Sequence, residues 1–191
     1  GEASRGRQDG VLAFDVPLVQ PGLALFAEVE AAQTRVIEAP FDALDITSEF
    51  YRGAIGARYA LIETGTETLN LDVTAEIKDS TTTLLGQRFS FSPGVQDGRA
   101  TAAILRFGRQ YTRRDEDQAL ALRSTVSVGV DALGATNNAD APDGQFVSWL
   151  GQVGYVRRLP LDARLELNGV VQLAFDDLLP FEQIEVTGAD A

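Results

Sequence analysis

An alternation of apolar and polar residues with a period of two runs through most of this chain. The clearest instance is segment 69–78, where the odd positions from Leu69 to Ile77 are apolar and the even positions from Asn70 to Lys78 are polar or charged. In a helix this pattern would scatter apolar side chains around the whole circumference, whereas in a strand it gives one apolar and one polar face. The pattern therefore predicts an all-β fold.

Seven further segments show the same alternation, some of them less regularly, so eight strands are predicted. These segments are 11–16, 23–31, 51–61, 100–110, 120–130, 147–155 and 165–173. Two apolar residues interrupt the pattern, Leu150 and Val170. Most of the segments reach the roughly 9–11 residues with which a tilted strand crosses a bilayer.

The connectors between these strands alternate in length. Short connectors are expected at 17–22, 62–66, 112–118 and 158–160, and long polar ones at 33–44, 79–98, 131–144 and from Asp176 onward. Outer-membrane barrels have tight periplasmic turns at one end and long external loops at the other. The chain is therefore predicted to form part of an antiparallel up-and-down transmembrane β-barrel. A different outer-membrane barrel, such as a porin or an autotransporter, and a soluble all-β binding module remain alternatives.

The polar face of each strand carries charged and amide side chains among small residues. In a membrane barrel this face would line a wet lumen, and in a soluble barrel it would face water, so periodicity alone leaves both assignments open. The residues predicted to line the lumen are Arg52, Arg58, Asp72, Glu76, Arg123, Arg164, Glu166 and Gln172. Aromatic residues near the strand ends, such as Tyr59 and Trp149, could form the girdles at the membrane interfaces.

The composition excludes most enzyme chemistry. The 191 residues include neither His nor Cys, which excludes disulfides, zinc clusters, thiol nucleophiles and Ser-His-Asp triads. The net charge of −12 argues against nucleic acid as a partner, because phosphates require a surplus of Lys and Arg. Gly-x-Gly-x-x-Gly and P-loop motifs are absent. The chain is predicted not to be an enzyme and to need no cofactor or metal.

Three polar segments were weighed as sites. Segment 137–144 is rich in oxygen ligands and could hold Ca²⁺, but it lacks the EF-hand spacing and closing Glu, so a solvated turn is favoured. Segment 113–117 is self-neutralising and predicts a polar turn. Asp176, Asp177 and Glu182 could act as paired carboxylates, although nothing in the sequence places a substrate between them.

The ends of the chain suggest a mature, truncated or excised polypeptide. The first residue is Gly1 rather than Met, and the first seven residues contain no apolar stretch of the kind found in a signal peptide. No apolar run approaches the roughly 18–20 residues that a transmembrane helix needs.

Several motifs resemble the transporters of two-partner secretion, which are the haemolysin-activator and filamentous-haemagglutinin transporters of the Omp85 superfamily. The most specific is Leu178-Leu179-Pro180-Phe181-Glu182-Gln183-Ile184, which resembles the opening of the long sixth loop in that family. Softer matches, in the family's order, lie at 14–23, 40–46, 84–88, 131–135 and 143–146. The family's Arg-Gly-Tyr/Phe loop tip would follow the Leu178–Ile184 motif and is not present.

The resemblance implies a type V secretion pore of the bacterial outer membrane. It would translocate a large, unfolded partner protein, an adhesin or haemolysin, without ATP or a cofactor. Residues 1–191 would supply about eight of the family's sixteen strands, up to the start of the sixth loop. The signal peptide, the POTRA domains and the remaining strands would lie outside the chain. Besides the client, the expected partner is outer-membrane lipid. In the family Leu179, Pro180, Phe181, Glu182 and Gln183 would have a structural role.

Overall fold

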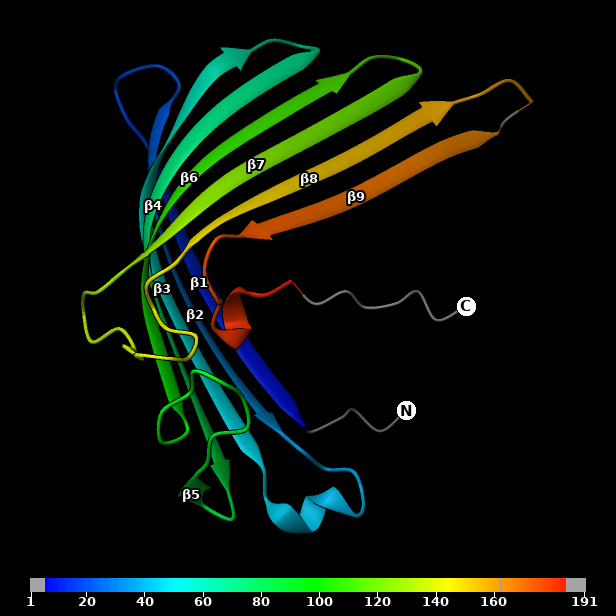
Figure 1. Ribbon diagram of the computed structural model, residues 1–191. Coiled ribbons are helices and arrows are strands. Elements are labelled where there is room, and N and C mark those ends of the chain that lie inside the picture. The colour runs from blue at the N-terminus through cyan, green and yellow to red at the C-terminus, as the bar shows by residue number, and fades with distance from the viewer. Residues whose placement is uncertain (1–5, 162, 185–191) are drawn as a thin grey trace.

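The computed structural model describes residues 6–161 and 163–184, which form one antiparallel, strongly curved sheet (Figure 1). Its long strands are β1 (Arg7–Pro17), β2 (Leu23–Arg35), β3 (Thr47–Glu63), β4 (Glu67–Leu84), β6 (Arg99–Arg114), β7 (Gln118–Val130), β8 (Val147–Arg158) and β9 (Arg164–Ala174). The two-residue β5 (Gln87–Arg88) pairs with the end of β4. Each long strand pairs with its neighbours along the chain, which confirms the predicted up-and-down all-β fold.

The only helical elements in the described residues are two short 3₁₀ turns, η1 (Phe41–Leu44) and η2 (Pro180–Glu182). No helix within the described part of the chain is long and apolar enough to cross a membrane.

Several strands are longer than the alternation predicted. β4 continues through segment 79–84, where the polar sequence predicts part of a long connector. β-Branched Thr nevertheless favours strands, and Thr81 to Thr83 pair with the start of β3. β1 likewise begins at Arg7 rather than near Val11. Polar continuations of this kind are typical of strands that project beyond an apolar band.

The short and long connectors lie at opposite ends of the sheet, as predicted (Figure 1). The turn between β6 and β7 shows how the short ones are closed. The carboxylate of Asp115 accepts hydrogen bonds from the Gln118 side chain at 2.9 Å and from the backbone N–H groups of Asp117 and Gln118. These bonds, the Gln118 side chain first, lower the pKa of Asp115 from its ordinary value.

Strand register assigns every side chain to one of two faces. Arg52 pairs with Lys78, and Thr74 pairs with Arg106, so these residues share the concave face of the sheet. The segment that follows β9 also lies on this side (Figure 1). The two residues that interrupted the sequence pattern, Leu150 and Val170, belong to the concave face as well, because they pair with Gln172 and Gln152.

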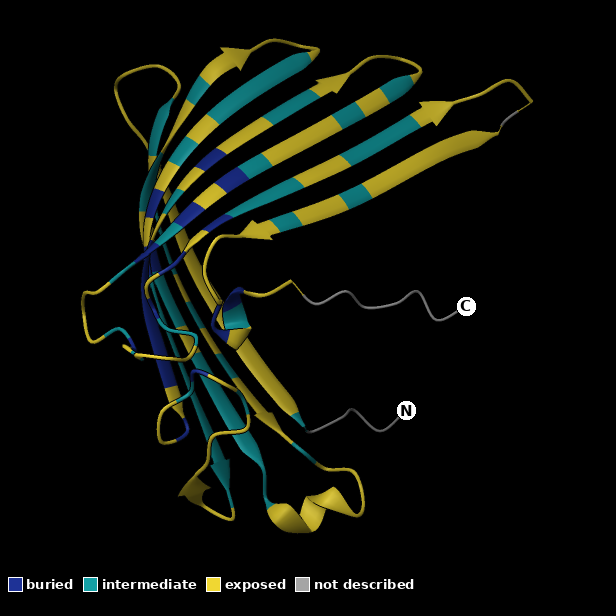
Figure 2. Ribbon diagram, in the orientation of Figure 1, coloured by how far each residue is buried: buried dark blue, intermediate teal, exposed yellow. Residues whose placement is uncertain are grey.

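The convex face is apolar and uncovered. Ile55, Val73 and Phe107 lie on it and are 65%, 49% and 50% exposed. Buried residues gather instead where loops cover the sheet (Figure 2). A soluble domain buries its large apolar side chains, whereas a membrane barrel turns them outward.

Candidate functional site

The eight residues predicted to line a lumen all lie on the concave face, as their register shows. The structure brings five of them to one polar hollow of about 620 Å³: Arg52, Arg58, Asp72, Glu76 and Arg123. Arg164 and Glu166 form an ion pair of 2.8 Å with each other on exposed β9. Gln172 instead contacts the segment after β9.

An ion-pair cluster lies at the centre of this face. Glu76 is almost fully buried, and its carboxylate lies 2.9 Å from Nε of Arg52 and 3.0 Å from a terminal nitrogen of Arg106. Arg52 also lies 2.9 Å from Glu28 of β2. Side chains from four adjacent strands thus neutralise one another, which a buried carboxylate requires.

Glu182 joins this cluster from the opposite direction. It lies in η2, and its carboxylate contacts Nζ of Lys78 at 2.7 Å and Arg106 at 2.9 Å. The Glu182 side chain is only 3% exposed. Arg106 therefore bridges two buried carboxylates, one from β4 and one from the loop. Among the described residues, the only other carboxylate near Lys78 is Glu76 at 3.6 Å, so the loop supplies the closest anionic contact of Lys78 in this part of the chain.

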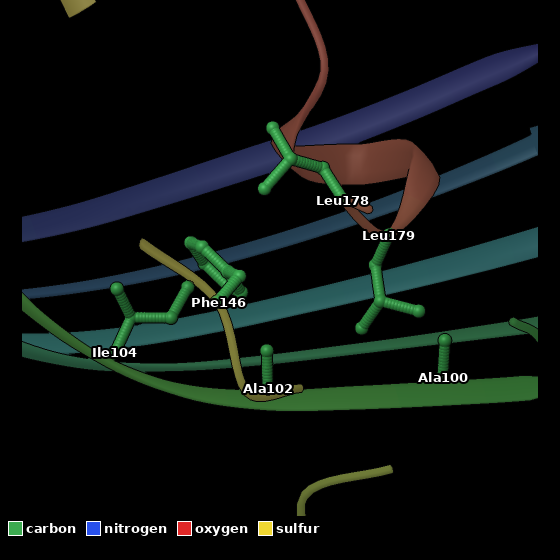
Figure 3. Close-up of a cluster of buried hydrophobic side chains, with 6 residues drawn as sticks. All are labelled: Ala100, Ala102, Ile104, Phe146, Leu178 and Leu179. Carbon is green, nitrogen blue, oxygen red and sulfur yellow. The ribbon is translucent and has the colours of Figure 1, made fainter. Parts of the chain in front are cut away.

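Apolar contacts hold the same loop against the sheet (Figure 3). Leu179 is fully buried and Leu178 nearly so, in a cluster with Ala100, Ala102 and Ile104 of β6. Phe146 completes the cluster from the connector before β8. This is the main buried apolar cluster among the described residues, and it joins the loop to the wall rather than two layers of a domain.

Gln172 and Phe181 complete the docking of the loop. The side chain of Gln172 donates a hydrogen bond to the carbonyl oxygen of Glu182 at 2.7 Å and accepts one from the N–H of Ile184 at 3.1 Å. The Phe181 ring lies 6.4 Å from that of Phe50 and 5.7 Å from Nζ of Lys78. Of the five motif residues, Leu179, Phe181 and Glu182 thus contact the wall directly. Pro180 begins η2, and Gln183 donates to the carbonyl of Leu178.

Sequence reasoning did not identify Arg106, and it assigned no specific role to Lys78. The concave positions of β6 before Arg106 are Ala100, Ala102 and Ile104, which are apolar because the loop covers them. The alternation of β6 is therefore weak, and its polar face could not be assigned. One signal was available: Arg106 and Gln110 are both polar and lie four residues apart, so in a strand they share one face.

Glycines make room for two concave side chains. The Asp72 carboxylate lies over Gly108, where any side chain would collide with it. The ring of Phe26 lies over Gly56 in the same way, and the guanidinium of Arg58 lies 5.3 Å from that ring. The concave face therefore carries a partly covered aromatic ring that the weak alternation of segment 23–31 did not indicate.

The carboxylates weighed as a pair have separate partners. Asp176 accepts a hydrogen bond from the N–H of Val147, whereas Glu182 contacts Lys78 and Arg106. In segment 137–144, Asn138 donates hydrogen bonds to the carbonyls of Gly94 and Pro142, so its amide links two loops. No group of three or more potential metal ligands occurs within residues 6–161 and 163–184.

Comparison with known proteins agrees with this architecture. The family profile described as "Haemolysin secretion/activation protein ShlB/FhaC/HecB" matches residues 2–191. The chain belongs to the ShlB/FhaC/HecB family. Its members are outer-membrane β-barrel transporters of two-partner secretion, within the Omp85 superfamily, rather than enzymes. This assignment places the chain in the bacterial outer membrane and confirms the resemblance seen in the sequence.

Two solved structures share the fold of this ShlB-family chain. CdiB from Escherichia coli superimposes with a TM-score of 0.73 at 13% sequence identity, over 90% of this chain and 32% of that one. CdiB from Acinetobacter baumannii gives a TM-score of 0.67 at 13% identity, over 96% and 32%. The chain thus spans about a third of the length of either CdiB. Among curated protein sequences none matches.

Proposed function

We propose that this chain forms the middle strands of an outer-membrane pore that moves a large secreted partner protein, an adhesin or haemolysin, to the cell surface. Strands and periplasmic POTRA domains outside this sequence complete the transporter. This proposal rests on the family assignment and on the third of each CdiB that the chain spans. It also accounts for β1 and β9, whose outer edges have no partner among the described residues.

The observation that carries the proposal is the polar hollow on the concave face. Its lining combines cations such as Arg58, Arg106 and Arg123 with carboxylates such as Asp72 and Glu76. The eight residues predicted to line the lumen, from Arg52 to Gln172, would face this path. An unfolded polypeptide can exchange weak contacts with charges of both signs without being held by any one of them.

The energy for transport comes from the client rather than from ATP. Folding of the client outside the cell would make its passage irreversible. A transporter reconstituted in vesicles should export its client without nucleotide. Export that depends on added ATP would contradict this part of the proposal.

Site-specific photocross-linking tests the path of the client. In the complete transporter, a benzophenone amino acid replaces Arg123 on the concave face or Leu122 on the convex face, two adjacent residues of β7. A client stalled during export should cross-link at position 123 and not at position 122. Cross-links at position 122 alone, or none at 123 while export proceeds, would refute the proposal. A diffusion porin predicts no client cross-link at either position.

A further inference from the structure

One arginine on the convex face lies in an otherwise uncharged band. In the eight long strands, the other charged residues of this face lie within three residues of a strand end or pair with an opposite charge: Arg35, Glu49, Glu67, Asp79, Arg99, Arg113 and Arg157. Arg109 lies five residues before the end of β6 and is exposed. Its neighbours across the ladders are Leu71 of β4 and Ser124 of β7.

Arg109 makes no ion pair within the described residues. An arginine that faces lipid costs about 2–4 kcal/mol at the centre of a bilayer and about 0–1 kcal/mol near the interface. In a membrane the side chain should therefore extend toward the nearer headgroup layer. That layer is on the side of the short connectors, which is the periplasmic side of an outer-membrane barrel.

An apolar groove adjoins Arg109. It has a volume of about 750 Å³ and is lined by Arg109 together with Tyr111, Leu122, Trp149, Val153 and Val171. This volume falls within the range of small-molecule pockets, about 300–1,000 Å³. The groove exists because Gly151 and Gly169 place no side chains on this part of the surface.

Trp149 gives the groove a fixed wall. Its indole N–H donates a hydrogen bond to Oγ of Ser124 at 2.9 Å, and its ring lies over Gly151, where a Cβ would come within 2.6 Å of it. With its only polar atom satisfied, the indole presents apolar surface to the groove.

We propose that Arg109 and this groove form a binding site for one anionic phospholipid of the periplasmic leaflet. The planar guanidinium binds the lipid phosphate through paired hydrogen bonds, and an acyl chain fills the groove beside Trp149. The net positive charge at the site favours an anionic over a zwitterionic headgroup. This inference rests on the proposed membrane orientation, in which the convex face contacts lipid.

Native mass spectrometry of the complete transporter tests the site, with phosphatidylglycerol added in detergent. The decisive variant is Arg109→Gln, and its matched control is Arg58→Gln, which removes the same charge from the concave face, away from the groove. The wild type and Arg58→Gln should retain one lipid, whereas Arg109→Gln should bind it at least about tenfold more weakly, or about 1.4 kcal/mol. Equal retention by the two variants would overturn the proposal.

Three further measurements test the groove and identify the source of the ligand. Gly169→Leu fills the groove and leaves Arg109 in place, so it should also weaken retention of phosphatidylglycerol. Displacement of the lipid by an equal concentration of inorganic phosphate would instead show a free-anion site, and equal binding of phosphatidylcholine would remove the role of charge. None of these measurements involves the client. A transporter that retains the lipid but does not cross-link its client at position 123 would therefore refute only the proposed function.

Discussion

Arg106 and Glu182 lie 76 residues apart in the sequence, yet one guanidinium nitrogen of Arg106 lies 2.9 Å from both carboxylate oxygens of Glu182. The same nitrogen lies 3.0 Å from Glu76 of β4. The loop that follows β9 is thus attached to the concave wall through charge as well as through Leu179. A change at Glu182 should release this attachment without disrupting the sheet, because Arg106 keeps its ion pair with Glu76 of β4.

Neutralising Glu182 should loosen the loop and leave the sheet intact. Glu182→Gln keeps the shape of the side chain, but it leaves Lys78 and Arg106 with only Glu76. Loss of a buried hydrogen bond to a charged group costs about 1–3 kcal/mol. A spin label at Ile184→Cys should become more mobile in this variant. The control Asp177→Asn removes the same charge from an exposed position of the same loop, and equal mobility in both variants would contradict the role given to Glu182.

The apolar part of the docking can be tested separately. Leu179 is fully buried against β6, so Leu179→Ala should cost about 2–5 kcal/mol of local stability. The expected result is faster proteolysis of the loop in the folded transporter. Leu133→Ala is the control, because Leu133 is 76% exposed and such changes usually stay within about 0.5 kcal/mol. Unchanged proteolysis in Leu179→Ala would show that charge alone holds the loop.

The sequence predicted the sheet well because a period of two is a property of single strands. Each of the eight long strands was found, and the eight candidate lumen residues share one face of the sheet. That this face lines a lumen stays a prediction. Leu150 and Val170 break the sequence pattern, but both pair in the regular register of β8 and β9. Their apolar side chains simply lie on a face that is otherwise polar.

What the sequence could not show were contacts between segments far apart in the chain. The pairing of Glu182 with Lys78 spans 104 residues, and no local pattern encodes it. The apolar concave positions of β6 obscured the alternation of this strand for the same reason, because their side chains pack against the distant loop after β9 rather than facing lipid. Arg109 escaped notice because segment 100–110 alternated too weakly to assign its faces, and only the register places this charge on the convex side.

A side chain at Gly108 should displace Asp72. A Cβ at this position would collide with the carboxylate of Asp72, so Gly108→Ala forces Asp72 to move and is expected to lower the yield of folded barrel. Gly154→Ala is the matched control on the same face, since its Cβ would meet only Asn168 at an ordinary 3.5 Å. Heat-modifiable migration in gel electrophoresis measures the folded fraction. Equal folding of the two variants would show that Asp72 moves aside at little cost.

The assignment of the two faces can be tested with single cysteines, because the chain has none of its own. Leu71, Asp72 and Val73 are consecutive residues of β4, and only Asp72 lies on the concave face. In membranes, Leu71→Cys and Val73→Cys should react with a lipid-soluble maleimide, and Asp72→Cys with a membrane-impermeant one. Apolar groups gain about 25 cal/mol per Å² on leaving water, so half-exposed Leu71 and Val73 belong in lipid. The reverse labelling pattern would place the apolar face inside the barrel and would contradict both the client path and the lipid site.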